Sequence, residues 1–150
     1  MSKKKAIRAP GKVQTYESFL GSVKLHALSL DEMSAKLNRD LYWKHLKRSE
    51  NITRAIEATY KPVNLEGDRF DIEARLTLTI ALRGSSDEIL TINCIYSAHF
   101  HAVLGFGIEA VEQFAKSGAK IIVWPYFRHF VSDMTSRMHI PPITIPLTLD

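Results

Sequence analysis

Cysteine is almost absent from this sequence, since Cys94 is the single one among 150 residues. No disulfide can form within the chain, a zinc site of four cysteines is excluded, and a reducing compartment is favoured. Long apolar runs are also missing. The basic start is followed by no stretch that suits a signal peptide, and no segment approaches the roughly 18 apolar residues of a membrane-spanning helix. We therefore expect a cytoplasmic protein without membrane insertion.

Patterns for catalysis and cofactor binding are lacking as well. The Gly-Phe-Gly segment at 105–107 is too short to be a phosphate-cradling loop. Asp133 has no second carboxylate at helical spacing with which to share general acid–base chemistry. We expect no enzymatic activity and no cofactor.

His99 and His101 are the one pair with metal-ligand character, because residues two apart on a strand project from the same face. No third ligand lies near them in the sequence, so a solvated or interface pair is favoured over a metal site. Cys94 has the opposite parity, which places it on the other face of the strand and prevents a nucleophile–base hydrogen bond.

The formal net charge of +4 is concentrated in two places. The first is the N-terminal stretch 1–12, with Lys3, Lys4, Lys5, Arg8 and Lys12 and no acidic residue. The second is the stretch 36–48, with Lys36, Arg39, Lys44, Lys47 and Arg48 around Tyr42 and Trp43. Solvated charge is one interpretation. The alternative is a small nucleic-acid-binding module, which uses the basic N-terminus and the 36–48 cluster to bind phosphates and stack bases.

Residues 69–82 alternate strictly between apolar and polar side chains, from Phe70 to Leu82. This period of two predicts a strand with one buried face. Residues 83–88 then form a turn, and 89–103 repeat the parity with Cys94 on the buried side. We expect further strands at 52–62, ending at Pro62, and more weakly at 23–30. For 31–48, a helix and an ordered connection both remain open.

The C-terminal third predicts helices. Residues 108–118 carry an apolar stripe and end at Gly118, and a second helix should begin at Pro125, with Phe127, Phe130, Val131, Met134 and Met138 inward. Trp124 and Tyr126 lie outside that stripe. The prolines at 141, 142 and 146 require an extended segment along the surface. The predicted fold is α+β, with a four-stranded antiparallel sheet and C-terminal helices packed on one face; residues 1–21 form a flexible basic segment and 22–150 a single domain.

The last 60 residues resemble a known family. The run INCIYSAHFHAVLGFGI, followed by WPYFRHFVSDMTSRMHIPPITIPLTLD, is similar to the C-terminal half of the SecB family of bacterial export chaperones. The resemblance rests on Pro125, Tyr126 and Arg128 at a helix start, Ser136 and Arg137 near its end, and Pro141, Pro142 and Pro146 in the extended finish.

The resemblance implies an α+β subunit of a dimer of dimers that holds unfolded polypeptides without ATP. It places the binding grooves between the crossover that joins the first two strands and the last helix. We expect Tyr42, Trp43, Trp124 and Tyr126 to line that surface; alternatively, they fill the core or the oligomer interface. Phe127 stands where the family has a small residue, Leu149 replaces an aromatic, and the pI near 9.2 contrasts with the acidic family. Delivery of exported proteins to the translocation motor is thus in doubt, and an antitoxin is an alternative dedicated client.

Overall fold

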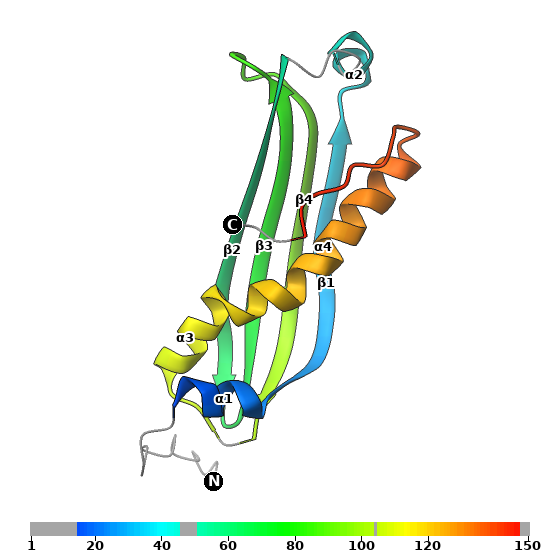
Figure 1. Cartoon of the computed structure of the whole chain (residues 1–150). Helices are drawn as coiled ribbons and strands as arrows, with labels where there is room; N and C mark the ends of the chain where they lie inside the picture. Colours follow the sequence, from blue (N-terminus) through cyan, green and yellow to red (C-terminus); the bar gives the residue numbers. More distant parts are fainter. Residues whose placement is uncertain (1–14, 46–50, 104, 148–150) are drawn as a thin grey trace. The chain divides into compact units, whose positions relative to one another are not determined.

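The computed structural model describes residues 15–45, 51–103 and 105–147. The elements in chain order are α1 (Tyr16–Ser22), β1 (Val23–Leu37), α2 (Arg39–His45), β2 (Ile52–Glu66), β3 (Arg69–Leu82), β4 (Glu88–Ala102), α3 (Ile108–Lys116) and α4 (Gly118–Arg137). The strands form one four-stranded antiparallel sheet in the order β1-β4-β3-β2 (Figure 1). The predicted α+β fold, with its C-terminal helices, is confirmed.

The chain divides into two compact units. Unit 1 comprises the described residues of Met1–Ser29, Tyr60–Ala74 and Tyr96–Val123, and unit 2 those of Leu30–Thr59, Arg75–Ile95 and Trp124–Asp150. Every strand and α4 contribute residues to both units.

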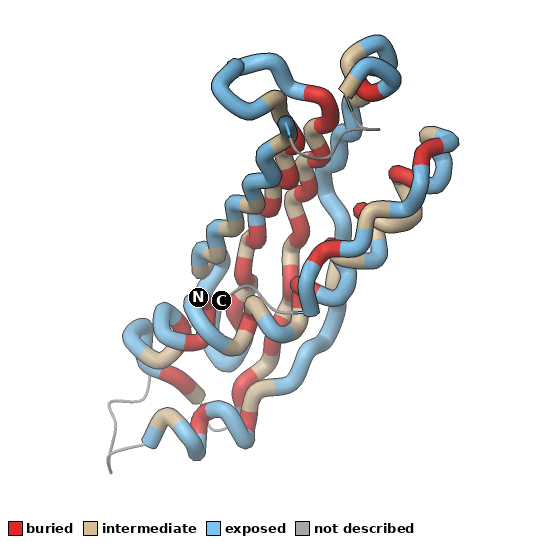
Figure 2. Tube along the Cα trace, turned by 45° about the horizontal axis from the view of Figure 1, so that its top comes forward, coloured by how far each residue is buried: buried red, intermediate tan, exposed pale blue. Residues whose placement is uncertain are grey.

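The predicted alternation in β3 and β4 is confirmed. Even-numbered residues are buried along nearly the whole of both strands, and Figure 2 shows the resulting alternation of buried and partly exposed positions. Cys94 lies on the buried side, as expected. A strand with one apolar face gains free energy only if that face is covered, which is why the parity persists over both strands.

Unit 1 is built around phenylalanine rings. Phe70 of β3 stacks on Phe100 of β4 with ring centroids 5.3 Å apart, and Phe114 of α3 meets Phe100 edge-on at 4.9 Å. Phe19 of α1 also contacts Phe70 and is only 1% exposed. α1 therefore includes residues 16–21 of the segment that the sequence predicts to be flexible. Phe19 anchors this helix, and Thr15 accepts a hydrogen bond at its N-terminus.

Unit 2 buries one side of the later turns of α4 through Trp124, Phe127, Val131 and Thr135. Phe130, Met134 and Met138, which the sequence placed on the inward stripe, are only half-buried. Trp124 therefore lies on the buried side of the helix, and part of the predicted inward stripe faces solvent. Spacings of three and four residues fit both stripes, so periodicity alone does not choose between them.

Two predicted boundaries in the first half of the chain are wrong. β2 continues through Pro62 to Glu66, because it is an edge strand beside β3 alone and one side of its backbone needs no partner. β1 continues to Leu37, so that only Arg39–His45 of the stretch 31–48 is helical in the described residues. The backbone N–H of Asn38 donates to the carbonyl of Ile89 at 2.8 Å, which shows that pairing with β4 extends to the end of β1.

The helix boundary near Gly118 also differs from the prediction. α3 ends at Lys116, Gly118 begins α4 instead of ending α3, and Pro125 lies inside α4. The ring of Phe114 packs so closely on Gly118 that an added Cβ atom would overlap it. Pro125 is exposed, and its missing N–H removes one hydrogen bond from the helix.

Candidate functional site

The aromatic pair of α2 has one buried and one exposed ring. Tyr42 is 8% exposed, whereas Trp43 is 55% exposed, and the two rings meet edge-on with centroids 5.4 Å apart. The side chain of Asn38 accepts a hydrogen bond from the backbone N–H of Leu41, which caps the start of this short helix. Of the two residues predicted here, Trp43 presents its indole to solvent.

The pair in α4 divides in the same way. Tyr126 is 52% exposed, but Trp124 is 2% exposed, and its Nε1 donates a hydrogen bond of 2.7 Å to the carbonyl of Pro146. Trp124 also packs on Phe127, with ring centroids 5.8 Å apart. In this structure Trp124 is a packing residue, and Tyr126 is the accessible ring.

Residues 140–147, here called the C-terminal strap, are held on α4 by further hydrogen bonds. The Nε atom of Arg128 donates to the carbonyl of Ile145 at 2.9 Å, and the hydroxyl of Thr135 accepts from the backbone N–H of Ile143 at 2.9 Å. Ile140 and Ile145 are buried. The sequence predicts the extended strap but not these anchors, because Arg128 reads as a solvated residue of the polar face.

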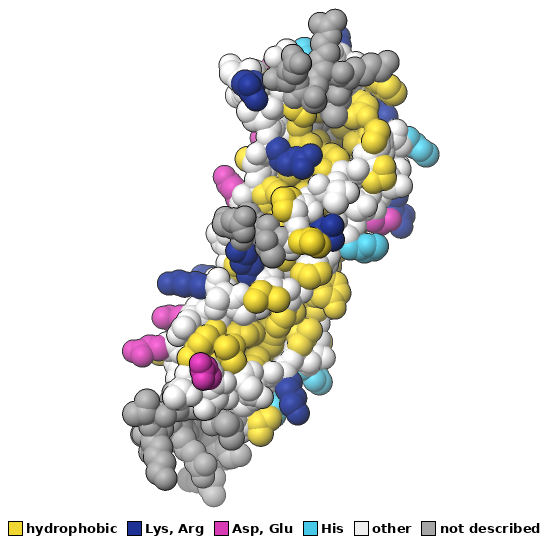
Figure 3. Space-filling view, in the orientation of Figure 1, with side chains coloured by type: hydrophobic (Ala, Val, Ile, Leu, Met, Phe, Trp, Pro, Cys, Tyr) yellow, Lys and Arg dark blue, Asp and Glu magenta, His cyan; other side chains and the backbone are white. Residues whose placement is uncertain are grey.

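Several other large apolar side chains remain exposed among the described residues. In unit 2 they are Leu30, Met33 and Leu147; in unit 1 they are Leu20, Leu25, Leu65, Val103, Ile108 and Ile121. Figure 3 shows hydrophobic side chains reaching the surface in each unit. Single exposed apolar residues are ordinary on proteins, but a contiguous patch indicates a binding surface.

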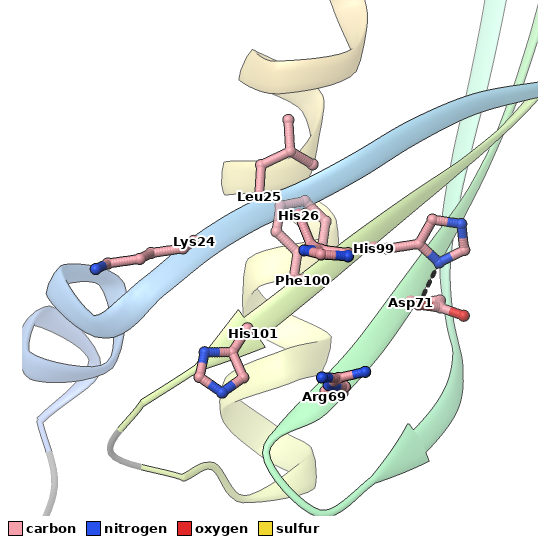
Figure 4. Close-up of a pocket in the computed structure, with 8 residues that line it drawn as sticks. All are labelled: Lys24, Leu25, His26, Arg69, Asp71, His99, Phe100 and His101. Carbon is pink, nitrogen blue, oxygen red and sulfur yellow. Dashed lines mark hydrogen bonds and ion pairs between the residues drawn. The ribbon is translucent and has the colours of Figure 1, made fainter.

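The two histidines of β4 each make a hydrogen bond with a carboxylate in unit 1. Nδ1 of His99 lies 2.7 Å from a carboxylate oxygen of Asp71, and Nε2 of His101 lies 2.6 Å from Asp68 (Figure 4 shows the first). The hydrogen bond with His101 lowers the pKa of Asp68 below its usual value. Within the described ranges, no three His, Cys, Asp or Glu side chains come together in a way that could hold a metal ion.

Comparisons with known proteins address the fold. No protein-family model and no curated protein matches the sequence. Among solved structures, a similar one is the Mycobacterium tuberculosis Rv1957 SecB-like chaperone, in complex with a ChAD peptide from the Rv1956 HigA1 antitoxin. The TM-score is 0.72 at 18% identity, covering 87% of this chain and 94% of that one. The fold is SecB-like.

The resemblance inferred from the sequence is therefore confirmed for the fold. A protein of unknown function from Streptococcus agalactiae matches less well, with a TM-score of 0.47 at 15% identity over 83% of this chain and 96% of that one. Within the described part of the SecB-like fold, none of the helices combines the length and apolar character needed to cross a lipid bilayer.

The basic cluster at 36–48 is only partly described in this SecB-like fold. Lys36 and Lys44 are exposed, while Arg39 is exposed and donates a hydrogen bond of 3.1 Å to the carbonyl of Met138. Lys47, Arg48 and the basic stretch 1–12 lie outside the described residues, as does Leu149. Arg39 therefore has a contact that ties α2 to the end of α4, which a purely solvated or phosphate-binding cluster does not require.

Proposed function

We propose that this chain is an ATP-independent holdase, a chaperone that binds non-native polypeptide segments without catalysing a reaction. The observation that carries the proposal is the exposure of Trp43 and Tyr126, together with Met33 and Leu147, in unit 2 of a SecB-like fold. Burying these side chains in the native monomer would add stability, so their exposure favours a use in binding. Apolar and aromatic contacts carry little directional demand and accept many client sequences.

We further propose that the chain assembles as a homo-oligomer, a dimer of dimers. β1 is an edge strand paired only with β4, and all of its 15 residues are exposed or half-exposed. A long edge strand carries unpaired backbone donors and acceptors that favour pairing with another chain. A second copy is the partner we expect at this edge.

The client we propose is a polypeptide with an extended apolar segment. Rv1957, the SecB-like chaperone of similar fold, is bound to a peptide from an antitoxin, so an antitoxin-like segment is the first candidate client for this chain. A protein destined for export is the second. Engagement of a translocation motor ATPase is not part of the proposal.

A salt-series titration tests the holdase function. The full chain is titrated into a fluorescently labelled, permanently unfolded polypeptide, and anisotropy reports binding. We expect saturable binding that persists at high salt, because apolar burial is not screened. Binding that disappears as salt rises would instead support the alternative of a nucleic-acid-binding module, since phosphate contacts weaken steeply with salt.

Two variants locate the binding surface. Trp43→Ala and Tyr126→Ala should each weaken client binding several-fold while the far-UV circular dichroism spectrum and the oligomer size are unchanged, because both rings are already exposed. Trp124→Phe is the contrasting variant: its ring is buried, so it should lower stability yet leave client binding by the folded protein unchanged. Collapse of the oligomer in either alanine variant would place these rings in a subunit interface and contradict their role in client binding.

A further inference from the structure

A pocket of about 500 Å³ opens on unit 1, on the partly exposed face of β4 that carries His99 and His101 (Figure 4). Here it is called the outer-face pocket. Its lining residues are Lys24, Leu25, His26, Arg69, Asp71, His99, Phe100 and His101. They come from three neighbouring strands, β1, β4 and β3. Three of them are imidazoles, a concentration that neither packing nor the holdase proposal requires.

The strand register explains why these imidazoles gather. The backbone N–H of Val103 donates to the carbonyl of Ser22, and that of Ala102 donates to the carbonyl of Asp68. Val103 is thus paired with Ser22, and moving along the two antiparallel strands from this pair places Lys24 opposite His101 and His26 opposite His99. The side chains of directly opposite residues project from the same face of the sheet. The result is two cross-strand rows of polar side chains rather than a chance surface cluster.

The charge of the pocket depends on protonation of these histidines. Lys24 of β1 and Arg69 of β3 are permanent cations. Asp71 of β3, Asp68 in the turn before β3, and Glu66 at the end of β2, opposite Arg69 across that turn, are anions. β2 contributes Asn64, whose neutral amide donates to Asp71 at 3.1 Å. With neutral imidazoles the three carboxylates outnumber the two cations, and each protonated imidazole adds one positive charge. Imidazole is the side chain that ordinarily gains charge between about pH 8 and about pH 5.

We propose that the outer-face pocket binds an acidic peptide segment, more tightly under mildly acidic conditions. Charge-assisted hydrogen bonds from imidazolium, guanidinium and ammonium groups to carboxylates supply the attraction. The proposal goes beyond the holdase function, because it concerns binding of a charged peptide by polar side chains of unit 1. It does not depend on the exposed apolar side chains.

A peptide fits this pocket better than a compact dianion. Asp71 and Asp68 lie within hydrogen-bond distance of His99 and His101, so a phosphate approaching the imidazoles also meets two carboxylates. An acidic peptide carries single charges spaced along its length, and its backbone N–H groups can donate to those carboxylates.

The test uses the full chain and two fluorescein-labelled peptides, one alternating glutamate with alanine and one alternating glutamine with alanine. Anisotropy titrations are made at about pH 7.5 and about pH 5.5. We expect the dissociation constant of the glutamate peptide to fall about tenfold on acidification, while the glutamine peptide binds weakly at both values. Equal binding of the two peptides, or no tightening on acidification, would overturn the proposal.

A matched pair of histidine variants assigns the effect. His26→Gln should remove a large part of the tightening, because His26 is exposed and lines the pocket. His129→Gln, at an exposed position of α4 in unit 2, should leave it unchanged. If His26→Gln keeps the whole decrease in dissociation constant on acidification, His26 does not contribute to the effect.

Displacement of the glutamate peptide by millimolar inorganic phosphate would show a small-anion site instead. Unfolded-client binding that fails while the glutamate peptide still binds would refute the holdase proposal alone.

Discussion

The indole nitrogen of Trp124 donates a hydrogen bond of 2.7 Å to the carbonyl oxygen of Pro146. This contact joins α4 to the C-terminal strap and fills both requirements of a buried tryptophan, an apolar surrounding for its ring and a partner for its N–H. It explains why Trp124 turns inward although the apolar spacing after Pro125 places it off the stripe. The strap, not the sheet alone, creates the site into which the ring packs.

Trp124→Phe should therefore lower the free energy of unfolding by about 1–3 kcal/mol, because the carbonyl of Pro146 loses its donor and the smaller ring leaves space. Urea denaturation followed by circular dichroism measures the change. Trp43→Phe is the matched control and should change the free energy of unfolding by less than about 0.5 kcal/mol, since Trp43 is exposed. Equal effects in the two variants would argue against a structural role for Trp124.

The hydrogen bond of Arg128 allows a second test of how the C-terminal strap is held on α4. Arg128→Gln removes the Nε donor to the carbonyl of Ile145, and we expect faster hydrogen–deuterium exchange in residues 143–147. Arg137→Gln is the control, because Arg137 makes only a solvent-exposed ion pair with Asp133 within α4. If exchange in the strap is unchanged by Arg128→Gln, the hydrogen bond does not hold it.

Gly118 and Gly21 should respond in opposite directions to alanine. At Gly118 a Cβ atom would overlap the ring of Phe114, so Gly118→Ala should destabilise the protein by about 1–3 kcal/mol. At Gly21, inside α1, a Cβ atom meets open space, and Gly21→Ala should stabilise by about 0.5–1 kcal/mol because alanine has the higher helix propensity. Thermal unfolding of both variants decides the matter, and a stabilising Gly118→Ala would contradict the close packing described here.

The environment of Tyr60 leads us to expect that the stability of the protein falls at alkaline pH. Its hydroxyl oxygen is buried without a hydrogen-bond partner in the described structure, and burial raises the pKa of Tyr60 to about 12. The unfolded chain, with the ordinary pKa near 10, then loses its proton first, so stability falls as the pH rises from about 10 to about 12. Urea midpoints over this range should decline less in Tyr60→Phe, which also removes the unpaired hydroxyl and should be as stable as the parent at neutral pH, or more so. An identical decline in both proteins would assign the alkaline loss to other groups.

The sequence by itself determined the sheet strands with strict alternation and the buried position of Cys94. In β3 and β4 one apolar face is continuous, and no other local structure can bury side chains with a period of two. The order of the C-terminal elements likewise indicated the SecB-like fold. Of the predicted client-binding residues, Trp43 and Tyr126 are exposed and Tyr42 and Trp124 are buried; their role in client binding stays a prediction.

Only the tertiary structure decided the remaining features, because each depends on residues distant in sequence. The edge position of β2 makes Pro62 acceptable within a strand. Pairing with β4 extends β1 to Leu37, into the stretch 31–48 for which the sequence left a helix and an ordered connection open. The outer-face pocket arises where antiparallel register sets His26 beside His99, 73 positions apart in the chain. Periodicity reports which face of an element is apolar, whereas register and packing partners are set by the free energy of the whole fold.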